Sequence, residues 1–185
     1  MVIAKGSVLR ATLGYIEASA GVQALADVKA RLPAAVRAQV DRIAPTDEIP
    51  FSLLREVWQA ADQVMAPIDA AWMEKAGAHS IESVGAQLYG GIIRKGTPLE
   101  FLTQPIKLFR LYYHGGDMQI VEQEPGRAVL RMVDFDEPDR LFCRRQTGGL
   151  RSAVELAGGK HTTVRHVRCA NEGDAFCEWE VSWTP

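Results

Sequence analysis

The sequence has few cysteines and no long apolar run, and each shortage excludes a class of protein. Three cysteines occur among 185 residues, and an odd number argues against a disulfide framework. No segment approaches the roughly twenty uninterrupted apolar residues of a membrane span, and the N-terminus lacks the basic stretch and apolar core of a secretory signal. We therefore expect a cytoplasmic protein, in which a reducing compartment keeps the cysteines as thiols or as metal-bound thiolates.

Strong net charge and catalytic motifs are also absent. The net charge is −2, the isoelectric point is near 6.1, and the basic residues are scattered. Neither nucleic acid nor an anionic membrane surface is therefore an expected partner. The sequence contains no G-x-S-x-G motif, no phosphate-binding glycine loop and no H-E-x-x-H motif, and no pair of carboxylates stands out as an acid/base couple. We expect a protein that is not an enzyme.

The residues that are present fit one globular domain. The chain is 47% apolar and 24% charged, which suits a sizeable core, and no internal repeat or linker divides residues 1–185. Apolar residues recur at helical spacing through the first two thirds, and the last third mixes the period of strands with one more helix. Helices followed by strands predict a single α+β domain.

Glycine, proline and capping residues mark the expected helix ends. Gly21 is expected to break the first helical segment, and Ser52 and Ser80 to cap two later helices. Thr97–Glu100 is a capping-box pattern with proline at the first helical position. The helix that follows is expected to bend at Pro105 and to end at a pair of glycines.

Two hairpins are expected in the last third of the chain. Residues 118–124 and 128–135 read as strands joined by a proline-glycine turn, and residues 161–170 and 175–183 form a second pair. Between them, residues 141–156 return to helical spacing.

The strongest chemical signal is a metal-binding pattern. Cys143, His166, Cys169 and Cys177 form C-x22-H-x2-C-x7-C and use every cysteine of the chain. Zinc binds thiolate and imidazole ligands tetrahedrally, and a site filled by four protein ligands is structural. In a regular strand His166 and Cys169 would point to opposite sides, so joint ligation requires a bulge or turn between them.

A plainer alternative exists for the same residues. Cysteine is among the most commonly buried residue types, so Cys143 and Cys177 would also fit as ordinary core residues, with His166 exposed on a strand. If zinc does bind, three neighbouring side chains are reserve ligands. These are His161, Asp174 and Glu178.

Five segments together carry a resemblance to a known family. They are Gly6–Leu9, Thr97–Leu102, Tyr112–Gly116, Gly148–Leu150 and Cys169–Trp183. Over nearly the whole chain the sequence resembles the 4-vinyl reductase domain, and within that group the paralogous family expanded in myxobacteria. The C-x7-C-x-W segment is the most specific part of the match, while the helical part matches mostly by pattern.

The resemblance implies a fold and a ligand set. The group includes haem-based nitric-oxide sensor domains and the small subunits of the TRAPP tethering complex, which implies helices packed on an antiparallel sheet and a homodimer formed through helices. The family's zinc ligands match Cys143, Cys169 and Cys177, while His166 stands where the family has an acidic residue. Haem is not expected, because the Tyr-x-Ser-x-Arg clamp of the related sensors is missing.

Two functions remain open at this point. One is an adaptor that dimerises and acts through a protein partner, which the lack of a fused effector in these residues slightly favours. The other is a sensor that binds a small apolar or aromatic ligand in a cavity between helices and sheet. Candidate lining residues, most of them equally suited to the core, are Trp72, Phe101, Phe109, Tyr112, Tyr113 and Trp179.

Overall fold

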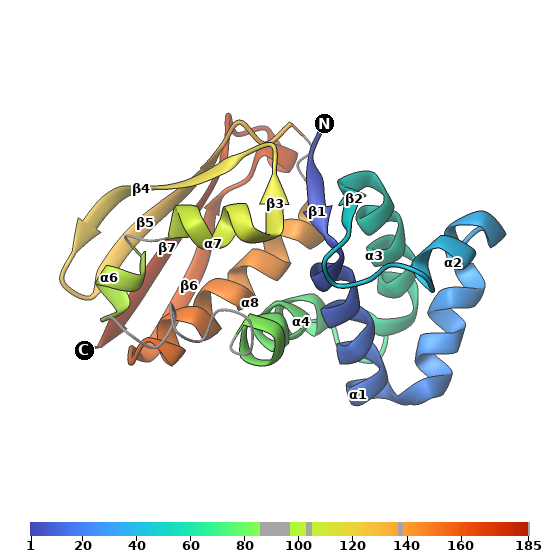
Figure 1. Ribbon diagram of the computed structural model, residues 1–185. Helices are drawn as coiled ribbons and strands as arrows, with labels where there is room; N and C mark the ends of the chain where they lie inside the picture. The colour runs from blue at the N-terminus through green and yellow to red at the C-terminus, as the bar shows by residue number, and fades with distance from the viewer. Residues whose placement is uncertain (86–96, 103–104, 137–138, 185) are drawn as a thin grey trace.

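The larger sheet and the N-terminal helices lie at opposite ends of the molecule (Figure 1). The computed structural model describes residues 1–85, 97–102, 105–136 and 139–184. Their arrangement is an α+β fold with antiparallel sheets, which confirms the predicted fold class. In these ranges, no helix combines the length and the apolar character needed to cross a membrane.

The N-terminal helices follow the predicted breaks. Helix α1 (Gly6–Arg31) is interrupted at Gly21, whose φ of 85° lies in the left-handed region that glycine adopts without strain. The chain turns back there into a second helical segment (Figure 1). Helix α2 (Ala34–Val40) follows Pro33, and α3 (Phe51–Met65) buries one face in the core.

Two predicted helix starts are wrong. Helix α3 begins one residue before Ser52, after Pro50, and has no side-chain cap. Helix α4 (Trp72–His79) continues directly into a π-helical turn, Ser80–Gly85, so Ser80 is buried within a continuous helical stretch. Tertiary packing of apolar side chains, rather than a local capping residue, sets both starts. The remainder of the helix expected after Ser80 lies outside the described residues.

The predicted capping box is confirmed. Thr97 N donates to Glu100 Oε2 at 2.8 Å, and Glu100 N donates to Thr97 Oγ1 at 3.3 Å. This box begins the short helix α6 (Pro98–Leu102). Helix α7 (Pro105–Tyr112) then starts at the proline where a bend was predicted.

Both predicted hairpins are present and share one antiparallel sheet of order β4-β5-β7-β6. Strands β4 (Asp117–Glu124) and β5 (Arg127–Val133) form the first hairpin, and β6 (Lys160–Arg168) and β7 (Cys177–Thr184) form the second. Pairing of β5 with β7 joins them. Helix α8 (Arg140–Leu156) connects the hairpins and lies between the sheet and the N-terminal helices (Figure 1).

The two faces of this sheet differ in chemistry. On the face toward α8, Trp179 is fully buried and its Nε1 donates to Thr147 Oγ1 at 3.0 Å. On the other face, Glu180 pairs with Arg165 at 2.7 Å. The alternation along β7 that the sequence indicated therefore separates the core face from a face of ion pairs.

A second, three-stranded sheet was not predicted. It has the order β2-β1-β3, formed by β1 (Ile3–Lys5), β2 (Glu48–Pro50) and β3 (Tyr113–His114). Strands of two or three residues are too short to show an alternating pattern. Because β3 takes Tyr113 and His114, the preceding helix ends earlier than the predicted Gly115.

Candidate functional site

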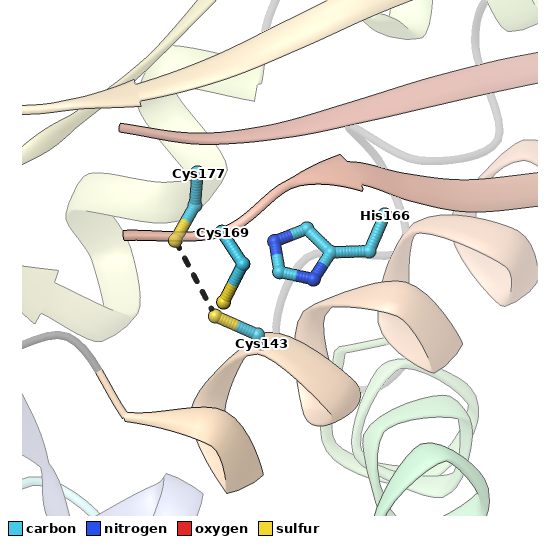
Figure 2. Close-up of side chains that lie close together, drawn as sticks. All are labelled: Cys143, His166, Cys169 and Cys177. Carbon is cyan, nitrogen blue, oxygen red and sulfur yellow. Dashed lines mark hydrogen bonds between the residues drawn. The ribbon is translucent and has the colours of Figure 1, made fainter. Parts of the chain in front are cut away.

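The structure brings the four predicted metal ligands together. Cys143 lies in the first turn of α8, His166 lies in β6, Cys169 follows β6, and Cys177 begins β7. Their candidate ligand atoms all lie within 4.8 Å of one another. Figure 2 shows the imidazole ring directed toward the three sulfur atoms, with Cys143 Sγ and Cys177 Sγ 3.5 Å apart.

The start of α8 fixes the position of Cys143. Asp139 caps the helix, because its Oδ1 accepts from Leu141 N at 2.8 Å and from Phe142 N at 3.1 Å. Cys143 N then donates to Asp139 O at 3.0 Å, within the first helical turn. The cap thus orients the residue that joins α8 to the cluster.

A bulge in β6 lets His166 and Cys169 reach the same side. His166 pairs with Trp179 and Arg168 pairs with Glu178, so the register shifts by one residue between these positions. This is the irregularity that joint ligation required. The His166 ring stacks on the Trp179 ring with centroids 4.7 Å apart and an interplanar angle of 20°.

The loop between β6 and β7 is held by hydrogen bonds to the cluster. Cys169 N donates to Asp174 Oδ2 at 2.7 Å, and Asp174 N donates back to Cys169 O at 3.2 Å. Ala170 N donates to Cys177 Sγ at 3.4 Å, and Asn171 Nδ2 lies 3.8 Å from Cys169 Sγ. Such donors to sulfur stabilise thiolates and orient metal ligands.

Two of the thiols, Cys143 and Cys177, have pKa values shifted in opposite directions. The hydrogen bond between them, together with burial, raises the pKa of Cys143 above its usual range. The same hydrogen bond from Cys143, helped by the His166 side chain and the Ala170 backbone N–H, lowers the pKa of Cys177 to about 4. Without a metal, the pair of thiols therefore shares one proton and carries one negative charge.

This donor set fits a zinc ion. Sulfur ligands about 2.3 Å from zinc in a tetrahedron lie about 3.8 Å apart, close to the observed 3.5 Å separation of Cys143 and Cys177. His166 Nε2 is buried, and within the described part of the chain it has no hydrogen-bond partner. A buried nitrogen without a partner is costly, and a metal would satisfy it. Three sulfurs and one nitrogen would fill all four positions.

The three reserve ligands do not belong to the converging set. His161 is exposed at the start of β6. Asp174 binds the backbone of Cys169, as described above, and Glu178 pairs with Arg131 at 2.8 Å on the opposite face of the sheet. These contacts leave Cys143, His166, Cys169 and Cys177 as the set that converges.

The residues proposed to line an apolar cavity separate into different regions. Trp72 is buried beside α3, where its Nε1 donates to Asp62 Oδ1 at 2.7 Å, and Trp179 belongs to the sheet. Tyr112 and Tyr113 line a small cavity of about 40 Å³. Phe109 packs on Tyr113 with ring centroids 5.3 Å apart. The side chain of Phe101 lies outside the described part of the structure.

Sequence reasoning missed one buried charge. Arg145 on α8 is only 4% exposed and lines the same small cavity. It follows buried Phe142 by three residues and precedes Gly149 by four, so it lies on an apolar helical face. An arginine at helical spacing among core residues was the available signal.

Comparisons with known proteins find the same fold but no close relative. No protein-family model matches the chain, and no curated protein matches it in sequence. An H-NOX protein from S. oneidensis in the Fe(II)NO ligation state is 17% identical, with a TM-score of 0.73, over 98% of this chain and 99% of that chain. An Fe(II) unliganded H-NOX protein from K. algicida is 12% identical, with a TM-score of 0.72, over 98% and 97%.

A third similar structure comes from work on haem distortion in the H-NOX family. It is 12% identical, with a TM-score of 0.72, over 98% of this chain and 95% of that chain. At such low identity, likeness along the whole chain establishes a shared fold. The finer assignment to the myxobacterial 4-vinyl reductase family stays a resemblance in sequence.

Proposed function

We propose that this chain is a small-molecule sensor module, without enzymatic activity, whose late helix and sheet are joined by a structural zinc ion. The observation that carries the sensor function is the whole-length likeness to H-NOX proteins, one of which is described in an Fe(II)NO ligation state. That S. oneidensis protein has the same fold and binds a small ligand. A shared fold alone does not fix function, so the ligand here has to be sought by experiment.

The sensor function is better supported than an adaptor without a ligand. The sequence by itself slightly favoured the adaptor. No contact or surface among the described residues favours it independently. A sensor still needs a protein partner to receive its signal, and we include such a partner, and a homodimer, in the proposal.

Haem does not fit the described residues. Haem needs an axial ligand, most often histidine or cysteine. His79, His114 and His161 are partly or fully exposed, and His166 and all three cysteines belong to the cluster described above. The buried aromatic rings around Phe51 pack directly on one another, as in the stacking of Phe135 on Phe142 at 4.6 Å.

The zinc ion would have a structural role. Cys143 would connect α8 to the hairpin that carries the other three ligands, and a closed set of four protein ligands contributes folding free energy. The convergence of the four ligand atoms within 4.8 Å of one another is the observation that most supports a bound metal.

The sensor function is tested by a ligand screen on the metal-containing protein. Differential scanning fluorimetry is run against apolar, aromatic and small acidic molecules, with native mass spectrometry of the freshly purified protein as a second readout. A ligand that binds only the native state raises the melting temperature in a concentration-dependent way. A panel without any saturable shift, together with a native mass that corresponds to chain and metal only, would favour the adaptor instead.

A further inference from the structure

Arg145 is a buried cation with few partners. Its guanidinium lies 5.7 Å from the centre of the Trp58 ring, and its Nη1 donates to Thr12 Oγ1 at 3.1 Å. It also donates to the hydroxyl group of Tyr113. Burial lowers the pKa of Arg145, but a guanidinium stays charged inside proteins.

None of these partners supplies a negative charge. Burial raises the pKa of Tyr113, which keeps its hydroxyl neutral. The Thr12 hydroxyl also has other hydrogen-bond partners, because it donates to Val8 O at 3.0 Å and accepts from Trp58 Nε1 at 3.2 Å. Among the described residues, no carboxylate lies within ion-pair distance of Arg145. A buried charge without a counter-ion is costly, so an arginine in this position favours an anionic partner.

A cavity of about 40 Å³ lies against this cation. It is bounded by α1, α4, α7 and α8, with Val8, Gly77, Tyr112 and Gly149 among its lining residues. The volume exceeds what one water molecule needs. Two glycines and two tyrosines give it mixed character, with small apolar walls and polar hydroxyl groups next to the guanidinium.

We propose that this cavity binds the carboxylate group of a small organic acid, with Arg145 as its anchor. The planar guanidinium fork matches a carboxylate through two parallel N–H···O bonds, which makes arginine the usual residue for this recognition. The inference rests on the proposed sensor function, because it names the ligand class and the site through which that module senses.

The position of Arg145 on α8 connects this site to the metal cluster. Cys143 and Arg145 are two residues apart, and side chains at that spacing point to different sides of a helix. Cys143 faces the sheet and its metal ligands, while Arg145 faces α1 and α4. A ligand at Arg145 would therefore lie between α8 and the N-terminal helices. The opposite side of α8 would be held by the metal.

The test measures binding of formate, acetate and benzoate to the metal-containing protein. Saturation-transfer NMR is used at constant ionic strength, with sodium chloride as the balancing salt. The variants are Arg145→Met, Arg145→Lys and Gly149→Ala. Arg144→Met is the matched control, because Arg144 is the preceding residue on α8 and its Nε lies 3.9 Å from Glu74 Oε1, away from the cavity.

Gly149→Ala keeps the test decisive if removal of Arg145 prevents folding. A Cβ at this position would meet Gly77 O and Ile81 Cγ1 at 3.7 Å, which is ordinary contact, and both residues line the cavity. Alanine also favours a helix more than glycine does. The variant should therefore fold and leave less room for the ligand.

We expect saturable binding of at least one of these acids at one site per chain. Arg145→Met and Arg145→Lys should weaken it by at least about tenfold, since a charged hydrogen-bonded pair is lost or distorted. Gly149→Ala should weaken it as well, and Arg144→Met should not. Unchanged binding in both Arg145→Met and Gly149→Ala would overturn the site while leaving the sensor function standing. The absence of any saturable carboxylate binding would overturn this inference. Binding of neutral ligands in the screen described above would then test the sensor function separately.

Discussion

His166 depends on its neighbours for the orientation that a metal requires. The bulge in β6 turns it to the same side as Cys169, and stacking on Trp179 holds its ring. The sequence shows only the types of these residues and their spacing. The bulge depends on how β6 pairs with β7, and pairing between strands is a property of the folded chain.

Replacement of Cys169 by serine should release the metal and destabilise the fold. The variant loses a thiolate from a closed site, and we expect the free energy of unfolding to fall by about 3 kcal/mol or more. Elemental mass spectrometry should give about one zinc per parent chain and much less for Cys169→Ser. The control is His114→Ala, which removes an exposed histidine and should keep both metal and stability. A Cys169→Ser protein that melts like the parent would count against a structural metal.

Zinc binding to the metal-free protein should release protons. The raised pKa of Cys143 keeps a proton on the coupled pair of Cys143 and Cys177 at neutral pH, whereas zinc ligands must be thiolates. The affinity should therefore increase as pH rises toward and above neutrality and fall as pH decreases. Isothermal titration calorimetry in buffers of different ionisation enthalpy measures the proton count directly. A binding enthalpy independent of the buffer would contradict protonated Cys143 in the metal-free site.

At the scale of elements, α4 and α8 cross at their glycines. A Cβ on Gly148 would lie 1.8 Å from Glu74 O, and a Cβ on Gly77 would lie 2.1 Å from Arg145 O. The two backbones therefore approach more closely than any side chain allows. The sequence indicated only that Gly148 and Gly149 weaken the middle of α8, because their closeness to another helix is a long-range contact.

Gly148→Ala should destabilise the protein although alanine favours a helix. The helix-propensity gain of about 1 kcal/mol is outweighed by the backbone shift that the added methyl group requires, and we expect a net loss of about 2 kcal/mol. Gly149→Ala is the matched control, because its Cβ meets nothing closer than 3.7 Å. Chemical denaturation of both variants tests the crossing. Equal stability of the two would show that the helices can separate at no cost.

The sequence predicted most helices and strands whose apolar residues recur at regular spacing. It missed features that depend on contacts with distant parts of the chain. Both hairpins and α8 were found because alternation and helical spacing persist over seven or more residues. The strands of the small sheet were missed because they are too short for any period. Ser80 resembled an N-cap in sequence, but the preceding helix continues through it. Arg145 was treated as a scattered basic residue because its burial depends on α1 and α4.

At the scale of the whole molecule, association between copies stays a prediction. The resemblance implies a homodimer formed through helices, and Val22 on α1 has 70% of its surface exposed. Burial of such apolar side chains between copies would favour the dimer. Light scattering should give twice the chain mass of 20.3 kDa. Val22→Lys should shift the protein toward monomer. The control, Val167→Lys on β6, should leave the dimer intact. A parent protein that is monomeric at every concentration would contradict the prediction.

The sheet order has a consequence for how the chain acquires its structure during synthesis. Strand β7 is the last of the four to leave the ribosome, yet it occupies an interior place between β5 and β6. Until it arrives, β5 exposes an unpaired edge and the cluster lacks Cys177. Pairs so distant in sequence form slowly. The nascent chain is therefore prone to aggregation until β7 inserts between β5 and β6. Zinc can bind all four ligands and stabilise the sheet only after that insertion.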